Sequence, residues 1–128
     1  MFDCLIVIDR DGTLIENRDY LGKDKNWKSR IKLIDKTVFL LNALDVIFPN
    51  NLKIVFTNQT GIALGFFSEE RVKEINNYVN SLLENEGAKI DYWIYSPEAD
   101  KEYAEKKGIK SNCYIKQVSN RKPNPQLL

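Results

Sequence analysis

The stretch Cys4-Leu5-Ile6-Val7-Ile8-Asp9-Arg10-Asp11-Gly12-Thr13 gives the clearest indication of the fold. Its first five residues form a continuous apolar run rich in β-branched side chains, which is typical of a strand buried on both faces of a parallel sheet. Two aspartates and a glycine follow at once and mark the end of the strand. We therefore expect a buried strand at residues 4–8, with Asp9 and Asp11 at its carboxyl end.

The segments that follow alternate between helical and strand patterns. Residues 16–30 are polar and aperiodic and predict a loop. Asp35 is placed to cap a helix over residues 36–48, and residues 53–57 form a second apolar run that predicts a strand ending at Thr57. Ser68 is placed to cap a helix over residues 69–86, and Gly87 stands where a helix-ending glycine belongs.

The last third of the chain continues the alternation in shorter pieces. Residues 90–95 predict a third strand, residues 101–107 a polar helix that stops at Gly108, and residues 113–116 a last short strand. Strands that alternate with amphipathic helices indicate an α/β fold with a parallel sheet. Ligands of such folds bind at the carboxyl ends of the strands, so Asp9 and Thr57 are both active-site candidates.

The composition fits a single small domain over residues 1–128. The formal net charge is +1, which gives no overall field toward nucleic acid or an anionic membrane. No apolar run is long enough to cross a bilayer, the N-terminus does not have the layout of a signal peptide, and we expect a cytoplasmic protein. With no histidine and only two cysteines, the chain excludes histidine catalysis and provides no zinc site.

The Asp9/Asp11 pair supports two interpretations. Side chains two residues apart at a strand end project to the same side, and two neighbouring carboxylates require a counter-charge such as Mg²⁺. Gly12 would let the backbone turn so that amide groups, including that of Thr13, face a bound anion. A turn rich in aspartate after a strand explains the same residues equally well.

Two further groups of polar residues gain meaning only in combination. Thr57 ends a buried strand, and its hydroxyl could donate to a phosphate oxygen together with Asn58 and Gln59. Arg121 and Lys122 supply a planar fork and a point charge, both suited to phosphate. Taken alone, the first group is an ordinary polar exit from a strand, and the second is an ordinary solvated pair.

The ordered combination resembles the haloacid dehalogenase (HAD) superfamily, and its heptose-bisphosphate and histidinol-phosphate phosphatase branch in particular. The similar stretches are Ile8-Asp9-Arg10-Asp11-Gly12-Thr13-Leu14-Ile15, Phe56-Thr57-Asn58-Gln59-Thr60-Gly61-Ile62-Ala63 and Arg121-Lys122-Pro123-Asn124-Pro125. The resemblance covers essentially the whole chain. It implies a three-layer Rossmann-like core with a parallel sheet that ends before the last strands, and no cap domain.

The resemblance also implies roles for single residues. Asp9 would be the nucleophile that forms an aspartyl-phosphate, and Asp11 the general acid and base. Mg²⁺ would be held by the Asp9 carboxylate and the Asp11 main-chain carbonyl, and Lys122 would offset developing charge. The remaining implied contacts are to phosphate or to a second anionic group of a sugar phosphate: Gly12, Thr13, Thr57, Asn58, Gln59 and Arg121.

The chain departs from the family pattern in two ways. A zinc-binding loop usually precedes the Lys-Pro motif, but residues 97–120 contain only Cys113, so no zinc is expected. A fourth motif with acidic metal ligands normally follows, and the sequence stops at Leu128 before it. We therefore expect a fragment, or a protomer whose sheet an oligomer partner completes.

Three functions stay open at this point. The first is a Mg²⁺-dependent phosphatase of a small phosphorylated metabolite, such as a heptose bisphosphate. The second is a polynucleotide 3′-phosphatase, against which the neutral charge argues. The third is a non-catalytic remnant that acts as a binding or assembly module, which the missing fourth motif favours.

Overall fold

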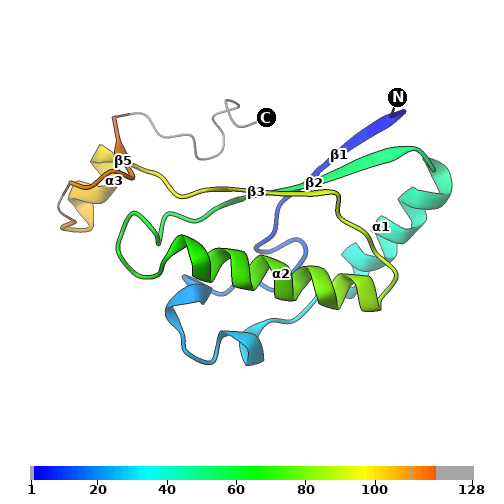
Figure 1. The fold of residues 1–128 in the computed structure, drawn as a ribbon, viewed down its shortest axis with the longest axis horizontal. Helices are drawn as coiled ribbons and strands as arrows, with labels where there is room; N and C mark the ends of the chain where they lie inside the picture. The colour runs from blue at the N-terminus through cyan, green and yellow to red at the C-terminus, as the bar shows by residue number, and fades with distance from the viewer. Residues whose placement is uncertain (1, 110, 118–128) are drawn as a thin grey trace.

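The computed structural model describes residues 2–109 and 111–117, and its centre is a three-stranded parallel sheet (Figure 1). The strands are β1 (Cys4–Ile8), β2 (Asn51–Asn58) and β3 (Tyr92–Ser96), in the order β1-β2-β3. Ile8 pairs with Val55, and Thr57 pairs with Tyr95. The parallel α/β fold predicted from the sequence is confirmed, and the alignment places the ends of β1 and β2 next to each other.

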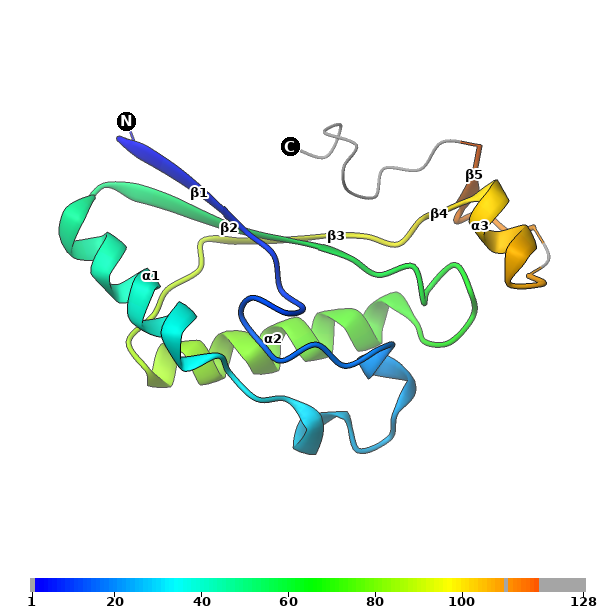
Figure 2. The ribbon, with the colours of Figure 1, turned by 180° about the vertical axis from the view of Figure 1, so that it is seen from behind.

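Two helices cover one face of this sheet (Figures 1 and 2). They are α1 (Asp35–Ile47) and α2 (Glu69–Asn85). Their apolar residues pack with those of β1, β2 and the loop between β1 and α1 into one core of buried side chains: Ile8, Leu14, Ile15, Leu21, Trp27, Val38, Leu41, Val55, Ile75, Val79, Leu83, Ala88 and Ile90. The described residues thus supply the sheet and one helical layer of the expected three-layer core.

The other face of the sheet is open in the part of the chain that the structure describes. Leu5 is 60% exposed and Val7 46% exposed, while Ile8 on the helical face is 6% exposed. The prediction that residues 4–8 are buried on both faces is therefore wrong for the described residues. The physical reason is that α1 and α2 cover only one face of the sheet, the face toward which Ile6 and Ile8 point (Figures 1 and 2).

The start of α1 also differs from the prediction. The helix begins at Asp35, its N-cap is Ile34, and no side chain caps it. The Ile34 amide donates to the Leu14 carbonyl at 2.9 Å, and Ile15 forms an antiparallel bridge with Leu33. These contacts hold the chain extended as far as Ile34, so Asp35 lies inside the first turn, where its charge still favours the helix dipole.

The α2 boundaries agree with the sequence. The Ser68 hydroxyl accepts a hydrogen bond from the Arg71 amide at 3.2 Å, as expected for an N-cap. Gly87 follows the helix with a φ of 77°, a conformation that glycine adopts without steric cost. The predicted helix thus forms with its cap and its terminating glycine.

The remaining elements are short. The β1–α1 loop contains two 3-10 turns, η1 (Leu21–Lys23) and η2 (Trp27–Arg30). Beyond β3, the chain forms β4 (Ala99–Asp100), α3 (Lys101–Lys106) and β5 (Ile115–Lys116), and β4 pairs with β5 in parallel. Figure 1 shows this small β4–α3–β5 unit beyond the carboxyl end of β3. No helix among the described residues has the length and apolarity that a membrane span requires.

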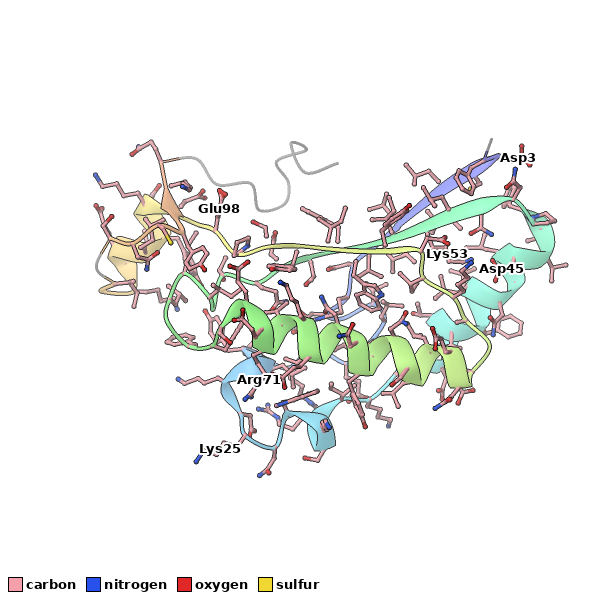
Figure 3. The ribbon with its side chains drawn as sticks, in the orientation of Figure 1. Asp3, Lys25, Asp45, Lys53, Arg71 and Glu98 are labelled. Atoms are coloured by element: carbon pink, nitrogen blue, oxygen red, sulfur yellow. The ribbon has the colours of Figure 1, made fainter. Side chains whose placement is uncertain are left out.

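An ion pair between a buried lysine and a partly exposed aspartate joins α1 to the middle of the sheet. The Lys53 ammonium donates to the Asp45 carboxylate and to Asn51 Oδ1, and Figure 3 shows Lys53 and Asp45 close together. Lys53 is 3% exposed. Burial raises the pKa of Asp45, but hydrogen bonds from Lys53 and Asn51 outweigh burial and leave that pKa below its ordinary value.

Candidate active site

The loop after β1 is a tight turn closed by its own backbone. The Leu14 and Ile15 amides donate to the Arg10 carbonyl at 3.0 and 3.1 Å, and the Gly12 amide donates to the Ile15 carbonyl at 2.8 Å. Gly12 has a φ of 85°, which favours glycine at this position. The Gly12 amide is therefore used within the turn, and Gly12 shapes the site through its backbone conformation.

Asp11 lies at the centre of a hydrogen-bond network. Its Oδ2 accepts from Gln59 Nε2 at 3.1 Å and from the Thr57 hydroxyl at 3.5 Å. Gln59 Nε2 also donates to the Thr57 hydroxyl at 2.9 Å. The two strand ends that the sequence singled out are thus joined directly. Asp11, in the loop after β1, bonds to Thr57 near the end of β2 and to Gln59 just after it.

Arg10, between the two aspartates, completes this network. Its guanidinium pairs with both carboxylate oxygens of Asp11 and donates to the Asn76 side chain of α2. Arg10 is 1% exposed. Buried guanidinium groups are tolerated only when they are paired and hydrogen-bonded, and both conditions are met here.

A pocket of about 350 Å³ opens beside this network. It is lined by residues of the β1–α1 loop, the loop after β2 and the end of α3: Arg10, Asp11, Asn17, Arg18, Asp19, Tyr20, Leu21, Asn58, Gln59, Thr60, Gly61, Phe67 and Lys107. A larger pocket, between α1 and α2, is lined by residues remote from the strand ends and does not include Asp11. We assign the site to the smaller pocket because it contains the candidate chemistry.

The predicted site residues divide into three groups. Asp9 is exposed directly after β1, and Asn58 and Gln59 line the pocket. Thr57 is 1% exposed and is not among the residues that line the pocket. Thr13 is partly buried in the turn, where its amide donates to the Arg10 carbonyl at 3.4 Å. Arg121 and Lys122 lie outside the described residues.

The small β4–α3–β5 unit contributes Lys107 to the lining of the pocket. The hydroxyls of Tyr20 and Tyr103 are 2.9 Å apart and share a hydrogen bond. Asn112 donates to the Ala63 carbonyl at 2.8 Å, which ties the unit to the loop after β2. Lys107 at the end of α3 is thereby held at the pocket, a position that the sequence did not predict.

Glu69 fastens the same unit to the start of α2. Its two carboxylate oxygens accept hydrogen bonds from Tyr95 at 2.7 Å and Tyr114 at 2.8 Å. These bonds lower the pKa of Glu69, with Tyr95 contributing most. Burial, followed by the bond to Glu69, raises the pKa of Tyr95 to about 12, and the same acceptor raises the pKa of Tyr114.

Two glycines allow the Phe67 ring to pack against the pocket wall. A Cβ atom at Gly61 would lie 2.3 Å from Phe67 Cε1, and one at Gly22 would lie 2.9 Å from Phe67 Cγ. Any larger residue would force the ring to move. Gly61 is therefore required by close packing.

Sequence reasoning missed Asn76 and the role of Arg10. One signal for Asn76 was present, because it falls four residues after Val72, on the apolar stripe of α2, where a polar residue must find a partner. Arg10 showed no such signal, since a charged residue after a strand is usually solvated.

The oxygen atoms of the site suit a hard cation. Asp9 and Asp11 supply carboxylates, and among the described residues no backbone amide donates to the Asp11 carbonyl oxygen. Mg²⁺ prefers one or two carboxylates supplemented by water and phosphate oxygens. The part of the chain that the structure describes contains no cluster of three or more His, Cys, Asp or Glu side chains that could hold a metal ion.

No family model matches the chain. Among curated proteins, it is 30% identical over 125 residues to the D-glycero-D-manno-heptose-1,7-bisphosphate 7-phosphatase of Chlorobaculum tepidum, covering 97% of this chain and 56% of that protein. It is also 30% identical to the D-glycero-beta-D-manno-heptose-1,7-bisphosphate 7-phosphatase of Pasteurella multocida, covering 96% and 59%. The chain thus spans little more than half the length of these relatives.

Solved structures give the same fold. A crystal structure of a HAD-like phosphatase from Mesorhizobium loti matches 98% of this chain and 54% of its own, with a TM-score of 0.77 and 26% identity. The D,D-heptose 1,7-bisphosphate phosphatase of B. bronchiseptica matches with a TM-score of 0.63 and 18% identity, covering 82% and 64%. The fold and the paired aspartates define a phosphatase-type domain of the haloacid dehalogenase superfamily. Within that superfamily, the sequence is similar to the heptose-bisphosphate phosphatases over 97% and 96% of this chain in the two relatives above.

Proposed function

We propose that this chain carries the nucleophile of a Mg²⁺-dependent phosphatase that hydrolyses a small phosphorylated sugar through an aspartyl-phosphate. The observation that carries the proposal is the meeting of two strand ends at one pocket, where Asp11 accepts a hydrogen bond from Gln59. Asp9 lies two residues before Asp11 and is exposed, although it is not among the residues that line the pocket. Relatives named heptose-bisphosphate phosphatases support the substrate class. The B. bronchiseptica neighbour, which was crystallised with magnesium and phosphate, supports the cofactor.

In this proposal, Asp9 attacks the phosphorus atom and the sugar oxygen leaves. Asp11 donates a proton to that oxygen and then accepts one from the water that cleaves the aspartyl-phosphate. Mg²⁺, when held by the Asp9 carboxylate and the Asp11 carbonyl, would neutralise phosphate charge. Asn58 and Gln59, with the turn at Gly12 and Thr13, would orient the phosphoryl group.

Thr57, Arg121 and Lys122 complete the proposed set of residues. Thr57 contacts Asp11 and Gln59 in the structure, so its contact with phosphate would require these bonds to rearrange. Lys122 would offset charge at the attacking carboxylate, and Arg121 would bind a second anionic group. Both roles rest on the sequence resemblance.

The test is hydrolysis of D-glycero-D-manno-heptose 1,7-bisphosphate and of p-nitrophenyl phosphate, with and without Mg²⁺. Asp9→Asn should lower kcat by about a thousandfold or more, since it removes the nucleophile. Asp3→Asn is the matched control, because Asp3 is exposed at the opposite end of β1 and should leave kcat unchanged. Equal rates for the wild-type chain and Asp9→Asn would refute the proposal and favour a non-catalytic module.

A further inference from the structure

Arg10 is the largest fully buried side chain among the described residues, although the proposed chemistry does not use it. It lies between the nucleophile Asp9 and the acid Asp11 in sequence. Taking a guanidinium out of water is costly unless its donors are satisfied. Its burial directly beside a catalytic carboxylate therefore calls for a specific role.

The fork of Arg10 fixes the plane of the Asp11 carboxylate. Nε donates to Oδ1 at 3.0 Å, and Nη2 donates to Oδ2 at 3.1 Å. The terminal torsion of an aspartate is broad, so an unrestrained carboxylate rotates easily. Two parallel hydrogen bonds remove that freedom, because the guanidinium and the carboxylate must lie close to one plane.

Asn76 in turn fixes the fork. Its Oδ1 accepts from Arg10 Nη1 at 2.9 Å, on the side of the guanidinium that does not face Asp11. Asn76 is 5% exposed on α2, and its neighbours Val72, Ile75 and Val79 are all fully buried. The position of Asn76 is thus set by the packing of α2 against the core.

We infer that Asn76 is a positioning residue for the Asp11 carboxylate and acts through Arg10. The inference rests on the proposed function of Asp11 as acid and base. Proton transfer requires a carboxylate oxygen within hydrogen-bond reach of the leaving oxygen, so a rotated carboxylate transfers a proton poorly. The chain from α2 through Arg10 to Asp11 couples helix packing to the geometry of the acid.

Three variants of α2 test the inference. Asn76→Leu has a similar size but removes the acceptor, and Asn76→Asp keeps an acceptor oxygen at the same place. Asn77→Leu is the matched control, because Asn77 is the next residue on the same helix and is exposed. Variants of Arg10 are avoided, since its removal would leave polar groups buried and could prevent folding.

The first readout is structural and does not depend on activity. Crystal structures should show the Asp11 carboxylate rotated, or in two orientations, in Asn76→Leu, and in its original orientation in Asn76→Asp and Asn77→Leu. Nitrogen-15 NMR should show separate Arg10 Nη signals in the wild-type chain, because the hydrogen bonds hinder rotation, and merged signals in Asn76→Leu. An unchanged Asp11 orientation in Asn76→Leu would overturn the inference.

The second readout compares two leaving groups. Cleavage of the 7-phosphate expels the sugar oxygen O7, an alkoxide that needs a proton as it leaves, whereas p-nitrophenolate leaves without one. Asn76→Leu should lower kcat/KM for the heptose bisphosphate about tenfold, and for p-nitrophenyl phosphate less than about threefold. In Asn76→Asp, kcat/KM for the heptose bisphosphate should stay within about threefold of the wild-type value.

The outcomes distinguish a failure of the positioning role of Asn76 from a failure of the proposed phosphatase function. Equal losses for both substrates would mean that Asn76 has only a structural role, and the inference fails. A wild-type chain that hydrolyses neither substrate refutes the proposed function, while the crystallographic comparison still decides whether Asn76 positions Asp11.

Discussion

The contact between Gly61 and Phe67 leads to a prediction at the scale of single residues. The ring touches both Gly61 and Gly22, so it has little room to move away from an added methyl group. Gly61→Ala should therefore lower the free energy of unfolding by about 1–3 kcal/mol, as overpacking usually does. Urea unfolding of the wild type and the variant measures the difference.

Replacement of the ring provides the control. In a Phe67→Leu background, the methyl group meets no ring, and Gly61→Ala should cost less than about 1 kcal/mol. If Gly61→Ala costs the same in both backgrounds, the contact with Phe67 is not the cause.

At the residue scale, the sequence predicted which residues are candidates for the site better than it predicted which side chains surround them. Asp9 and Asp11 were found from their spacing and their place after an apolar run, and the structure puts both at the end of β1. The burial of Arg10 could not be foreseen, because its partner Asn76 is 66 residues away along the chain. Side chains that meet only through the tertiary fold leave no local pattern.

At the scale of elements, the ion pair between α1 and β2 should respond differently to removal of each partner. Asp45→Asn leaves the Lys53 ammonium buried with Asn51 as its remaining partner. Because Asp45 is 39% exposed, solvent screens the pair, and we expect a loss of about 1–2 kcal/mol.

Lys53→Met is the counterpart of that variant. It removes the buried charge, keeps the apolar stem and should cost less than about 1 kcal/mol. Chemical denaturation of both variants shows whether Asp45→Asn loses more stability than Lys53→Met. A larger loss for Lys53→Met would mean that the pair itself, and not the stranded ammonium, determines the cost.

The bonds between Glu69 and its two tyrosines predict a dependence on acid pH. The pKa of Glu69 in the folded chain is below its ordinary value of 4.5, so the stabilisation is fully present above pH 4.5. It is lost as the pH falls through the lowered value. At neutral pH, Tyr114→Phe should destabilise the chain, and the difference from wild type should shrink at pH 3.

Thermal unfolding at the two pH values measures this difference. Tyr92→Phe is the control, because Tyr92 is exposed on β3 and should behave like wild type at both. A deficit for Tyr114→Phe that stays the same at pH 3 would exclude Glu69 as the partner responsible.

At the scale of the whole molecule, the two faces of β1 should tolerate substitution very differently. Leu5 is 60% exposed, whereas Ile6 on the opposite face packs against the core. Leu5→Thr should change the free energy of unfolding by less than about 0.5 kcal/mol. Ile6→Thr should cost about 2 kcal/mol or more, because it places a hydroxyl in the core. Similar losses in urea unfolding would contradict the assignment of the faces.

The same strand shows where sequence reasoning stops at this scale. The apolar run at residues 4–8 correctly predicted a strand in a parallel sheet, and the pattern at residues 69–86 predicted α2 almost residue by residue. An apolar run does not reveal which strands or helices lie beside it, so burial on both faces could not be decided from Leu5 and Val7. Similarly, the prediction that Asp35 caps α1 failed because Ile34 bonds to Leu14 and Leu33 bridges to Ile15, contacts with residues about 20 positions earlier that no local pattern reveals.

The parallel strand pairing also has a consequence for how the chain folds. Residue 4 pairs with residue 51, and residue 54 pairs with residue 92, so neither strand pair can form as a local hairpin. Each pairing must close a loop of roughly forty residues before its contacts repay the lost chain entropy. We expect α2, with its local cap and terminating glycine, to form early. The docking of β1 and β3 onto β2 should then set the folding rate.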